Sequence, residues 1–376
     1  MNKIFYLLAV ICLLSCQDKP KKITELGDFE EVKVDYAKGF SIKKYKDFTQ
    51  INVHKPWPDA EKDLIYIVAD ENIQLPENFE YEALITKPVD KIVTTSTTHI
   101  PSLISLDKIE NLVGFPNLDY ISSKEARKLI NEGEIRDIGQ NESINTEVLL
   151  SLQPDLIFSF AIEGRNKTLD QARNAGIPVI YNSDWLEENP LGKAEWIKFF
   201  GAFLGKLDQA ESEFNQVVSD YKATKKLAEK TERQPTVISG AMHQDRWYLP
   251  YGNSWQAQFF EDANANYIYS YTKGKGSIAL AFEKVLEKAQ DTEFWVSPGH
   301  YSSYEALLST NKHYAEFEAF QNKNIYTMAN TKGETGGVLF YELGPNRPDL
   351  ILKDLVKIFH PDLLSEYELT FFKPLD

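Results

Sequence analysis

Two series of alternating strands and helices constrain the fold of this 376-residue chain more than any other feature. From Lys91 onward, apolar strand segments such as DKIVTTST, DLIFSF and IPVIYN alternate with helical segments. The alternation starts again after residue 232 with PTVISG, TEFWVS and NIYTM. Strands that alternate with helices form parallel sheets with helices on their faces. The sequence therefore predicts two α/β lobes, over residues 91–192 and 233–376.

The segment between the two series, residues 193–232, is predicted to form two connecting helices. The second of these, over residues 208–230, contains neither glycine nor proline and carries one apolar stripe at Phe214, Val217, Val218 and Tyr221. At 1.5 Å per residue this helix spans roughly 35 Å, about one domain diameter. We therefore expect two Rossmann-like lobes joined by one long rigid helix.

The N-terminal part of the chain differs from the rest. Residues 24–90 alternate apolar and polar side chains between turn residues, which predicts a β-rich extension packed on the first lobe. Residues 1–16 combine a charged start with an apolar run from Ile4 to Leu14, shorter than the ~20 residues of a membrane-spanning helix. This pattern is typical of a secretory signal, and residues 17–23 read as a polar tether.

Composition excludes several classes of function. The formal net charge of −15 argues against binding to nucleic acid or to anionic lipid surfaces. No cysteine follows Cys16, so the mature chain holds no disulfide, cysteine metal site or cysteine nucleophile. The G-x-S-x-G, H-E-x-x-H and P-loop motifs are also absent. We therefore expect a protein that is not an enzyme and has no cofactor of its own.

A short unit occurs twice, 136 positions apart. Residues 147–158 read EVLLSLQPDLIF and residues 283–296 read EKVLEKAQDTEFWV, each with a glutamate at its head and an aspartate eight places on. A single acid at a helix start is explained by the helix dipole, worth ~0.3–1 kcal/mol. Matching acids on two matching lobes indicate instead that Glu147 and Glu283 meet a shared external partner.

These segments resemble a known family. IRDIGQNESINTEVLLSLQPDLIFSF, ALAFEKVLEKAQDTEFWVS and GPNRPDLILKDLVKIFHP are similar to signatures of the substrate-binding proteins of siderophore, haem and cobalamin ABC importers. The resemblance runs from about Lys91 to Pro361. It implies that the lobes enclose a metal chelate and that Glu147 and Glu283 dock on arginines of a membrane permease. LLSC likewise resembles a lipobox, which implies that Cys16 carries a lipid anchor on a monomeric, extracytoplasmic protein.

Ligands of open α/β sheets bind beyond the carboxyl ends of the strands. Aromatic rings with a few polar groups are the usual lining for a large and partly apolar ligand. The residues near the predicted strand ends form the candidate ligand set: His99, Arg165, His243, Arg246, Trp247, Tyr251, Trp255, His300 and Tyr301. One departure from the family concerns STTHIP, where His99 stands at a position that is often acidic in the family.

Two other functions stay open at this point. His99, His243 and His300 all fall at strand ends, so a receptor that binds a bare metal ion through these histidines is the alternative. A purely structural surface lipoprotein is the other, although it would not need two matched acids. Which of siderophore, haem or cobalamin is bound does not follow from the sequence.

Overall fold

The computed structural model describes residues 20–376 and contains the two expected lobes. The sheet of the first lobe is parallel, with the strand order β10-β9-β8-β13-β14. Its strands are β8 (Ile92–Thr94), β9 (Leu112–Phe115), β10 (Arg136–Asp137), β13 (Leu156–Phe160) and β14 (Val179–Asn182). Helices α1 (Ile100–Ser105), α2 (Lys124–Glu132), α3 (Thr146–Leu152) and α4 (Asp170–Asn174) lie between these strands in the chain.

The sheet of the second lobe has the order β18-β15-β20-β21-β22 and is parallel except at β22. Its strands are β15 (Thr236–Ser239), β18 (Asn266–Tyr267), β20 (Phe294–Val296), β21 (Ile325–Thr327) and β22 (Lys373–Pro374). Helices α8 (Trp255–Asp262), α9 (Phe282–Ala289), α10 (Tyr304–Thr310) and α11 (Glu318–Gln321) belong to this half of the chain.

The two sheets match strand for strand over four positions. In each lobe the first strand of the series, β8 or β15, lies inside the sheet, with β9 or β18 on one side. On its other side come β13 and β14 in the first lobe, and β20 and β21 in the second. The repeated unit therefore occupies the same place in both lobes, since α3 leads into β13 and α9 leads into β20. The predicted fold class is confirmed.

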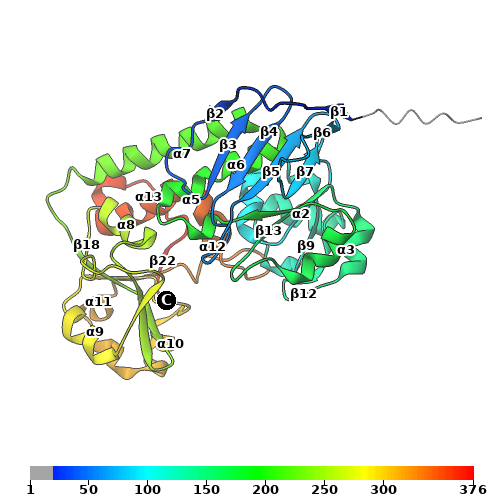
Figure 1. The fold of residues 1–376 in the computed structure, drawn as a ribbon. Coiled ribbons are helices and arrows are strands. Elements are labelled where there is room, and N and C mark those ends of the chain that lie inside the picture. Colours follow the sequence, from blue (N-terminus) through cyan, green and yellow to red (C-terminus); the bar gives the residue numbers. More distant parts are fainter. Residues whose placement is uncertain (1–19) are drawn as a thin grey trace, which may run out of the picture.

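The extension forms a separate five-stranded sheet in the order β2-β3-β4-β5-β7. Its strands are β2 (Glu30–Val32), β3 (Phe40–Lys44), β4 (Thr49–Val53), β5 (Leu64–Ala69) and β7 (Ala83–Thr86). Its inward side chains, among them Phe40 and Tyr66, share one hydrophobic core with the first lobe. Figure 1 shows the blue strands of this sheet beside α6 (Ile197–Leu204) and next to the first lobe.

Two buried carboxylates fasten the extension to the connecting helices. Glu195, in α5 (Pro190–Glu195), accepts hydrogen bonds from the backbone N–H groups of residues 35, 36 and 37. It also accepts one from Lys198 Nζ at 2.8 Å. Glu187 accepts from the N–H groups of Lys38 and Gly39. Gly39 approaches so closely that a Cβ there would lie 2.7 Å from the Trp196 ring.

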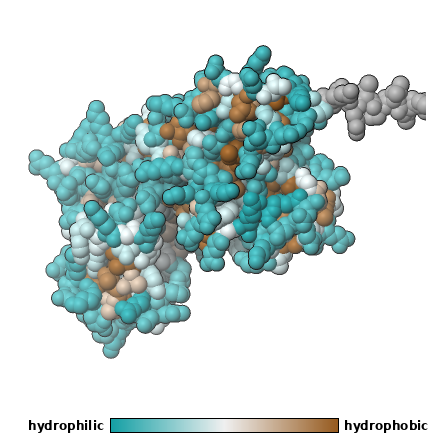
Figure 2. All heavy atoms as spheres, in the orientation of Figure 1, coloured by the Kyte–Doolittle hydropathy of each residue, from teal (hydrophilic) through white to brown (hydrophobic). Residues whose placement is uncertain are grey.

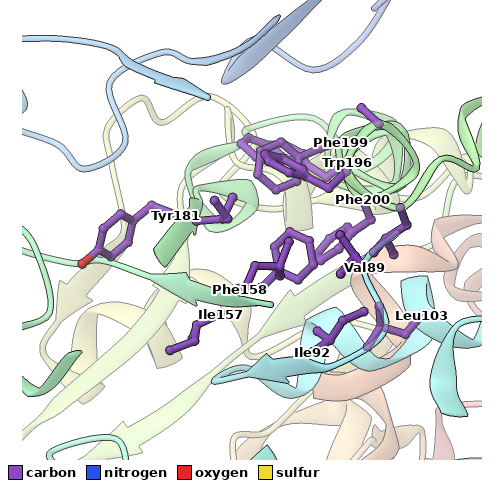
Figure 3. Close-up of a cluster of buried hydrophobic side chains, with 14 of the residues drawn as sticks. Val89, Ile92, Leu103, Ile157, Phe158, Tyr181, Trp196, Phe199 and Phe200 are labelled. Atoms are coloured by element: carbon purple, nitrogen blue, oxygen red, sulfur yellow. The ribbon is translucent and has the colours of Figure 1, made fainter. Parts of the chain in front are cut away.

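The aromatic core beneath this sheet is dense. Figure 3 shows Trp196, Phe199 and Phe200 from the connecting helices packed over Phe158 of β13. The ring centroids of Phe158 and Phe200 lie 4.8 Å apart, and those of Trp196 and Phe199 lie 5.0 Å apart. Extension, connecting helices and first lobe therefore form one continuous hydrophobic unit.

The long helix α7 runs from Leu207 to Ala228, close to the predicted 208–230. Its apolar stripe serves both lobes, because Phe214 belongs to the first-lobe core and Tyr221 to the second-lobe core. Val217 and Val218 lie between them and contact both cores. Helix α13 (Pro348–Phe359) lies along α7, as Figure 1 shows. The helix is therefore a shared support for the two lobes.

The second lobe carries an additional antiparallel sheet of β16 (Ala241–His243), β17 (Arg246–Pro250) and β19 (Ser277–Leu280).

Within residues 20–376, no helix combines the length and the apolar character needed to cross a membrane. Figure 2 shows a largely hydrophilic face with apolar patches over the extension and on the second lobe.

Candidate ligand cleft

A pocket of about 270 Å³ lies at the carboxyl ends of the first-lobe strands. Residues that follow β8, β9 and β13 line it, and the loop at Asn141 adds an amide. Ser96 and Thr97 contribute hydroxyl groups, and Tyr120 contributes an aromatic ring. This is the edge of a parallel sheet at which ligands of open α/β proteins bind.

A second pocket, of about 240 Å³, lies at the carboxyl ends of the second-lobe strands. Ser239 at the end of β15, Ser297 after β20 and Met328 after β21 place it at the matching edge of the second sheet. Its remaining walls include imidazole, phenol and thioether groups from His243, Met242, Tyr248, His300 and Tyr301. We call the two cavities the first-lobe pocket and the second-lobe pocket.

The first-lobe pocket is shared between the two halves of the chain. Gly337, Val338 and Tyr341, which precede α13 and belong to the second half, form one of its walls. Glu342, in α12 (Leu339–Leu343), fixes this wall by accepting hydrogen bonds from the backbone N–H groups of Ser122 at 2.5 Å and Ser123 at 3.0 Å. Burial of this carboxylate raises the pKa of Glu342. The pocket therefore lies where the two lobes meet.

Aromatic rings stand at the mouths of these pockets. Tyr120 and Tyr341 are 58% and 59% exposed at the first-lobe pocket, and Tyr248 is 42% exposed at the second-lobe pocket. Large aromatic side chains that stay exposed in a folded protein are available for contact with a ligand. The two pockets can thus offer aromatic faces, hydroxyl groups and imidazoles to a partly apolar molecule.

The structure brings three of the predicted ligand residues together. His243, His300 and Tyr301 all line the second-lobe pocket. The rings of His300 and Tyr301 are stacked with centroids 4.8 Å apart. The remaining six predicted residues do not line either pocket.

The prediction that Trp247 lines the cleft is wrong. Its side chain is fully buried, stacks on Trp295 at 5.1 Å and donates from Nε1 to the Ser239 carbonyl at 3.0 Å. Side chains alternate across a strand, so Trp247 and Leu249 face the core while Tyr248 faces outward. The aromatic residue that lines the pocket is therefore Tyr248, the neighbour of the predicted Trp247.

The placement of His99 in the cleft is also wrong. The imidazole is 1% exposed and packs against Phe158 and Phe200. Neither Nδ1 nor Nε2 has a hydrogen-bond partner among residues 20–376. Burial without a partner disfavours the charged ring, which lowers the pKa of His99 to about 3. The histidine that replaces the family's common acid is part of the first-lobe core.

Arg165 and Arg246 likewise stay outside both pockets. The guanidinium of Arg165 forms a two-pronged ion pair with Glu82 of the extension, with Nη2 and Oε2 2.6 Å apart. Arg246 lies at the exposed tip of the β16–β17 hairpin, 4.0 Å from Asp245. Both arginines thus face carboxylates, and neither lines one of the two pockets.

Tyr251 and Trp255 are held by other parts of the second half. Tyr251 packs against Gly274, where an added Cβ would lie 2.5 Å from its Cζ. Trp255, at the start of α8, stacks on Phe340 with centroids 6.4 Å apart, and Lys193 Nζ lies 5.3 Å from its centroid. Neither ring lines one of the two pockets, and their predicted contact with a ligand stays a prediction.

The alternative of a bare metal-ion site built from three histidines is contradicted. His243 and His300 share the second-lobe pocket, whereas His99 is enclosed in the first-lobe core. Among residues 20–376, no group of three or more His, Cys, Asp or Glu side chains is arranged to hold a metal ion.

The two matched glutamates are exposed at the starts of their helices. Glu147 lies in the first turn of α3 and Glu283 in the first turn of α9. Neither takes part in an ion pair with another of the described residues. Both are therefore available to a partner, and their docking role stays a prediction. The proposed lipid attachment at Cys16 lies outside the described residues.

The sequence analysis missed several pocket residues: Thr97, Tyr120, Asn141, Met242, Tyr248, Met328 and Tyr341. Tyr248 and Met242 could have been found from the two-residue period of the β16–β17 hairpin. Tyr341 could not have been found from strand ends, because it comes from a segment that crosses to the other lobe.

Comparison with known proteins agrees with this architecture. The model of the family described as "Periplasmic binding protein" matches residues 92–331. An uncharacterized lipoprotein of Methanocaldococcus jannaschii is 25% identical over 338 residues, covering 88% of this chain and 78% of the relative. The vitamin B12-binding protein of Vibrio parahaemolyticus is 19% identical over 262 residues, covering 68% and 87%.

Two solved structures share the fold. A possible iron-binding (periplasmic solute-binding) protein of Staphylococcus epidermidis has a TM-score of 0.59 at 17% identity, covering 73% of this chain and 100% of that one. A periplasmic heme-binding protein of Roseiflexus has a TM-score of 0.54 at 19% identity, with the same coverage. The family consists of binding proteins, which confirms that the chain is not an enzyme. With its two matched lobes and more than half of its length covered by the family model, the chain belongs to the periplasmic binding protein family.

Proposed function

We propose that this chain is a lipid-anchored extracytoplasmic receptor that binds an iron or cobalt chelate between its lobes and delivers it to an ABC permease. The observation that carries the proposal is the pair of pockets at the carboxyl ends of two matched sheets. Exposed tyrosines at both mouths suit a large, partly apolar ligand. The similarity to B12-binding, iron-binding and heme-binding proteins supports a chelate as that ligand.

Delivery to a permease is supported by Glu147 and Glu283. The two carboxylates occupy matching positions on the two lobes, and both are exposed. Helix α7 packs on both lobe cores and would hold the two acids at a set separation. A permease that offers a cation to each acid would therefore bind the receptor in one orientation.

Lipid anchoring is supported by the sequence LLSC around Cys16 and by the relative that is named a lipoprotein. We expect Cys16→Ala to yield a folded protein that no longer sediments with membranes. Fractionation of cells that express each form measures this. Continued membrane association of the variant would contradict the anchor.

The chelate itself is tested by native mass spectrometry of the protein purified from its own cell, followed by fluorescence titration. The indoles of Trp247 and Trp295 bond to the carbonyl groups of Ser239 and Gly240, which line the second-lobe pocket. A bound iron or cobalt chelate should therefore quench tryptophan emission in a saturable way. A flat titration with siderophore, haem and cobalamin chelates alike would overturn the proposal.

A further inference from the structure

The walls of the two ligand pockets carry no permanent positive charge. Among the described residues that line them, none is lysine or arginine. The first-lobe pocket includes one carboxylate, Glu342, and is otherwise lined by uncharged side chains. The second-lobe pocket has only the imidazoles of His243 and His300 as ionisable bases.

Three basic side chains that follow first-lobe strands in the sequence are committed elsewhere. Arg165 is neutralised by Glu82 of the extension. Lys193 is largely buried and donates to the carbonyl groups of Asp184 at 3.0 Å and Trp185 at 3.3 Å. Arg127 is also buried and donates to the Leu118 carbonyl at 2.8 Å. None of the three lines either pocket.

The lack of cations is specific to these pockets. A separate hollow of about 640 Å³, between the extension, the first lobe and the second lobe, is lined by Lys38, Lys55 and Lys275. The chain therefore places lysines around this hollow, whereas none of the described residues that line the two ligand pockets is a lysine. With a formal net charge of −15, the protein as a whole also repels anions.

An anion that leaves water for such a pocket loses its hydration and gains no opposite charge in return. This cost is large unless the charge is paired or fully hydrogen-bonded. An uncharged or cationic molecule avoids the cost and can still use the tyrosine faces, which attract cations. The carboxylate of Glu342 adds to this preference at the first-lobe pocket.

We infer that the cleft selects metal chelates without net negative charge, such as uncharged or cationic ferric hydroxamates and corrinoids, over anionic ferric catecholates and haem. This inference rests on the proposed function, because it defines which chelates the same two pockets accept. The absence of lysine and arginine from both linings is the observation behind it.

The test compares dissociation constants of the full-length protein for an uncharged ferric tris-hydroxamate, a trianionic ferric tris-catecholate, cobalamin and haem. We expect the hydroxamate or cobalamin to bind at least about tenfold more tightly than either anionic chelate. Tighter binding of catecholate or haem would overturn the inference and leave the proposed function intact. Binding of none of the four would overturn the proposed function, and the inference with it.

A designed cation provides a second arm. Tyr341 is 59% exposed at the first-lobe pocket, so Tyr341→Arg should fold normally and place a positive charge at the mouth. We expect the preference for the uncharged chelate to shrink by about tenfold, the change that one close charge pair of ~1.4 kcal/mol brings. Tyr341→Gln removes the same ring without adding a charge, so the ratio in Tyr341→Arg is compared with the ratio in Tyr341→Gln. An unaltered ratio in Tyr341→Arg would show that charge does not set the preference.

Discussion

The two lobes share one strand order but use their histidines in opposite ways. In the first lobe, His99 follows β8 and is enclosed by Phe158 and Phe200. In the second lobe, His243 and His300 follow β15 and β20 and line a pocket. A position directly after a strand therefore does not decide whether a histidine lies in the cleft or in the core. His99 leads directly into α1, which packs in the first-lobe core, whereas His243 lies in the β16–β17 hairpin.

The lobes also differ in what supports them. The first lobe is backed by the extension, whose sheet shares its hydrophobic core and whose backbone bonds to Glu187 and Glu195. The second lobe instead adds the small antiparallel sheet that carries Tyr248 and His243 to its pocket. The sheet of the extension stabilises the first lobe, and the small antiparallel sheet shapes the ligand site of the second lobe.

The largest effect should come from removing the attachment of the extension. Glu195→Ala deletes a fully buried carboxylate and leaves Lys198 and three backbone N–H groups without their partner. We expect a loss of about 3–5 kcal/mol in the free energy of unfolding, the usual cost of breaking a buried ion pair. Urea denaturation measures it.

Glu132→Ala, which changes an exposed glutamate of α2, is the matched control and should stay within about 0.5 kcal/mol. If Glu195→Ala lowered the free energy of unfolding no more than Glu132→Ala does, the extension would not be part of the first-lobe folding unit.

Reversing the charge of Glu147 and Glu283 tests whether the two lobes dock on the permease in the same way. Glu147→Lys or Glu283→Lys should each reduce uptake through the cognate permease about tenfold or more, because close charge pairs across an interface couple by ~1.5–7 kcal/mol. The double variant should be more impaired than either single one. Chelate affinity and stability of the purified variants should stay unchanged, since both side chains are exposed.

Glu305→Lys, on exposed α10 of the second lobe, controls for the change in net charge. Normal uptake by the double variant, in cells where Glu305→Lys also transports normally, would remove the docking role.

The first lobe should lose folding stability in acid because its buried histidine, His99, resists protonation. Because the folded pKa of His99, about 3, is below the ordinary value of ~6.5, the unfolded chain binds the proton first as pH falls. Stability from this group is complete above ~6.5 and declines as pH falls toward 3. At pH 5 the loss should be about 1–2 kcal/mol relative to neutral pH.

His99→Leu should abolish that part of the decline and leave neutral stability almost unchanged, because neither ring nitrogen has a partner to lose. Denaturation at several pH values compares it with wild type and with the second-lobe variant His243→Leu, which alters an exposed ring. An equal acid decline in wild type and His99→Leu would contradict the placement of His99 in the core.

Periodicity was sufficient to predict the architecture. The two strand series, the glycine-free helix and the repeated unit are local patterns, and they led to the observed lobes and to α7. The pockets depend on contacts that no local pattern contains. Trp247 and Tyr248 differ only in which face of β17 they occupy. Tyr341 reaches the first lobe because the neighbouring Glu342 accepts hydrogen bonds from the backbone of Ser122 and Ser123. The ion pair between Arg165 and Glu82 could not be predicted from a local pattern either, because 83 positions separate the two residues in the chain.

The central claim is that one chelate contacts both lobes at once, and a titration of two tyrosine variants tests it most directly. Tyr341→Ala truncates a ring at the first-lobe pocket, and Tyr248→Ala truncates one at the second-lobe pocket. Tyr271→Ala, 67% exposed and outside both pockets, is the control. The account predicts that each pocket variant weakens binding of the same chelate by about 1 kcal/mol or more, that the double variant weakens it further, and that the control binds as wild type. Wild-type affinity in either pocket variant would contradict a ligand held between the lobes.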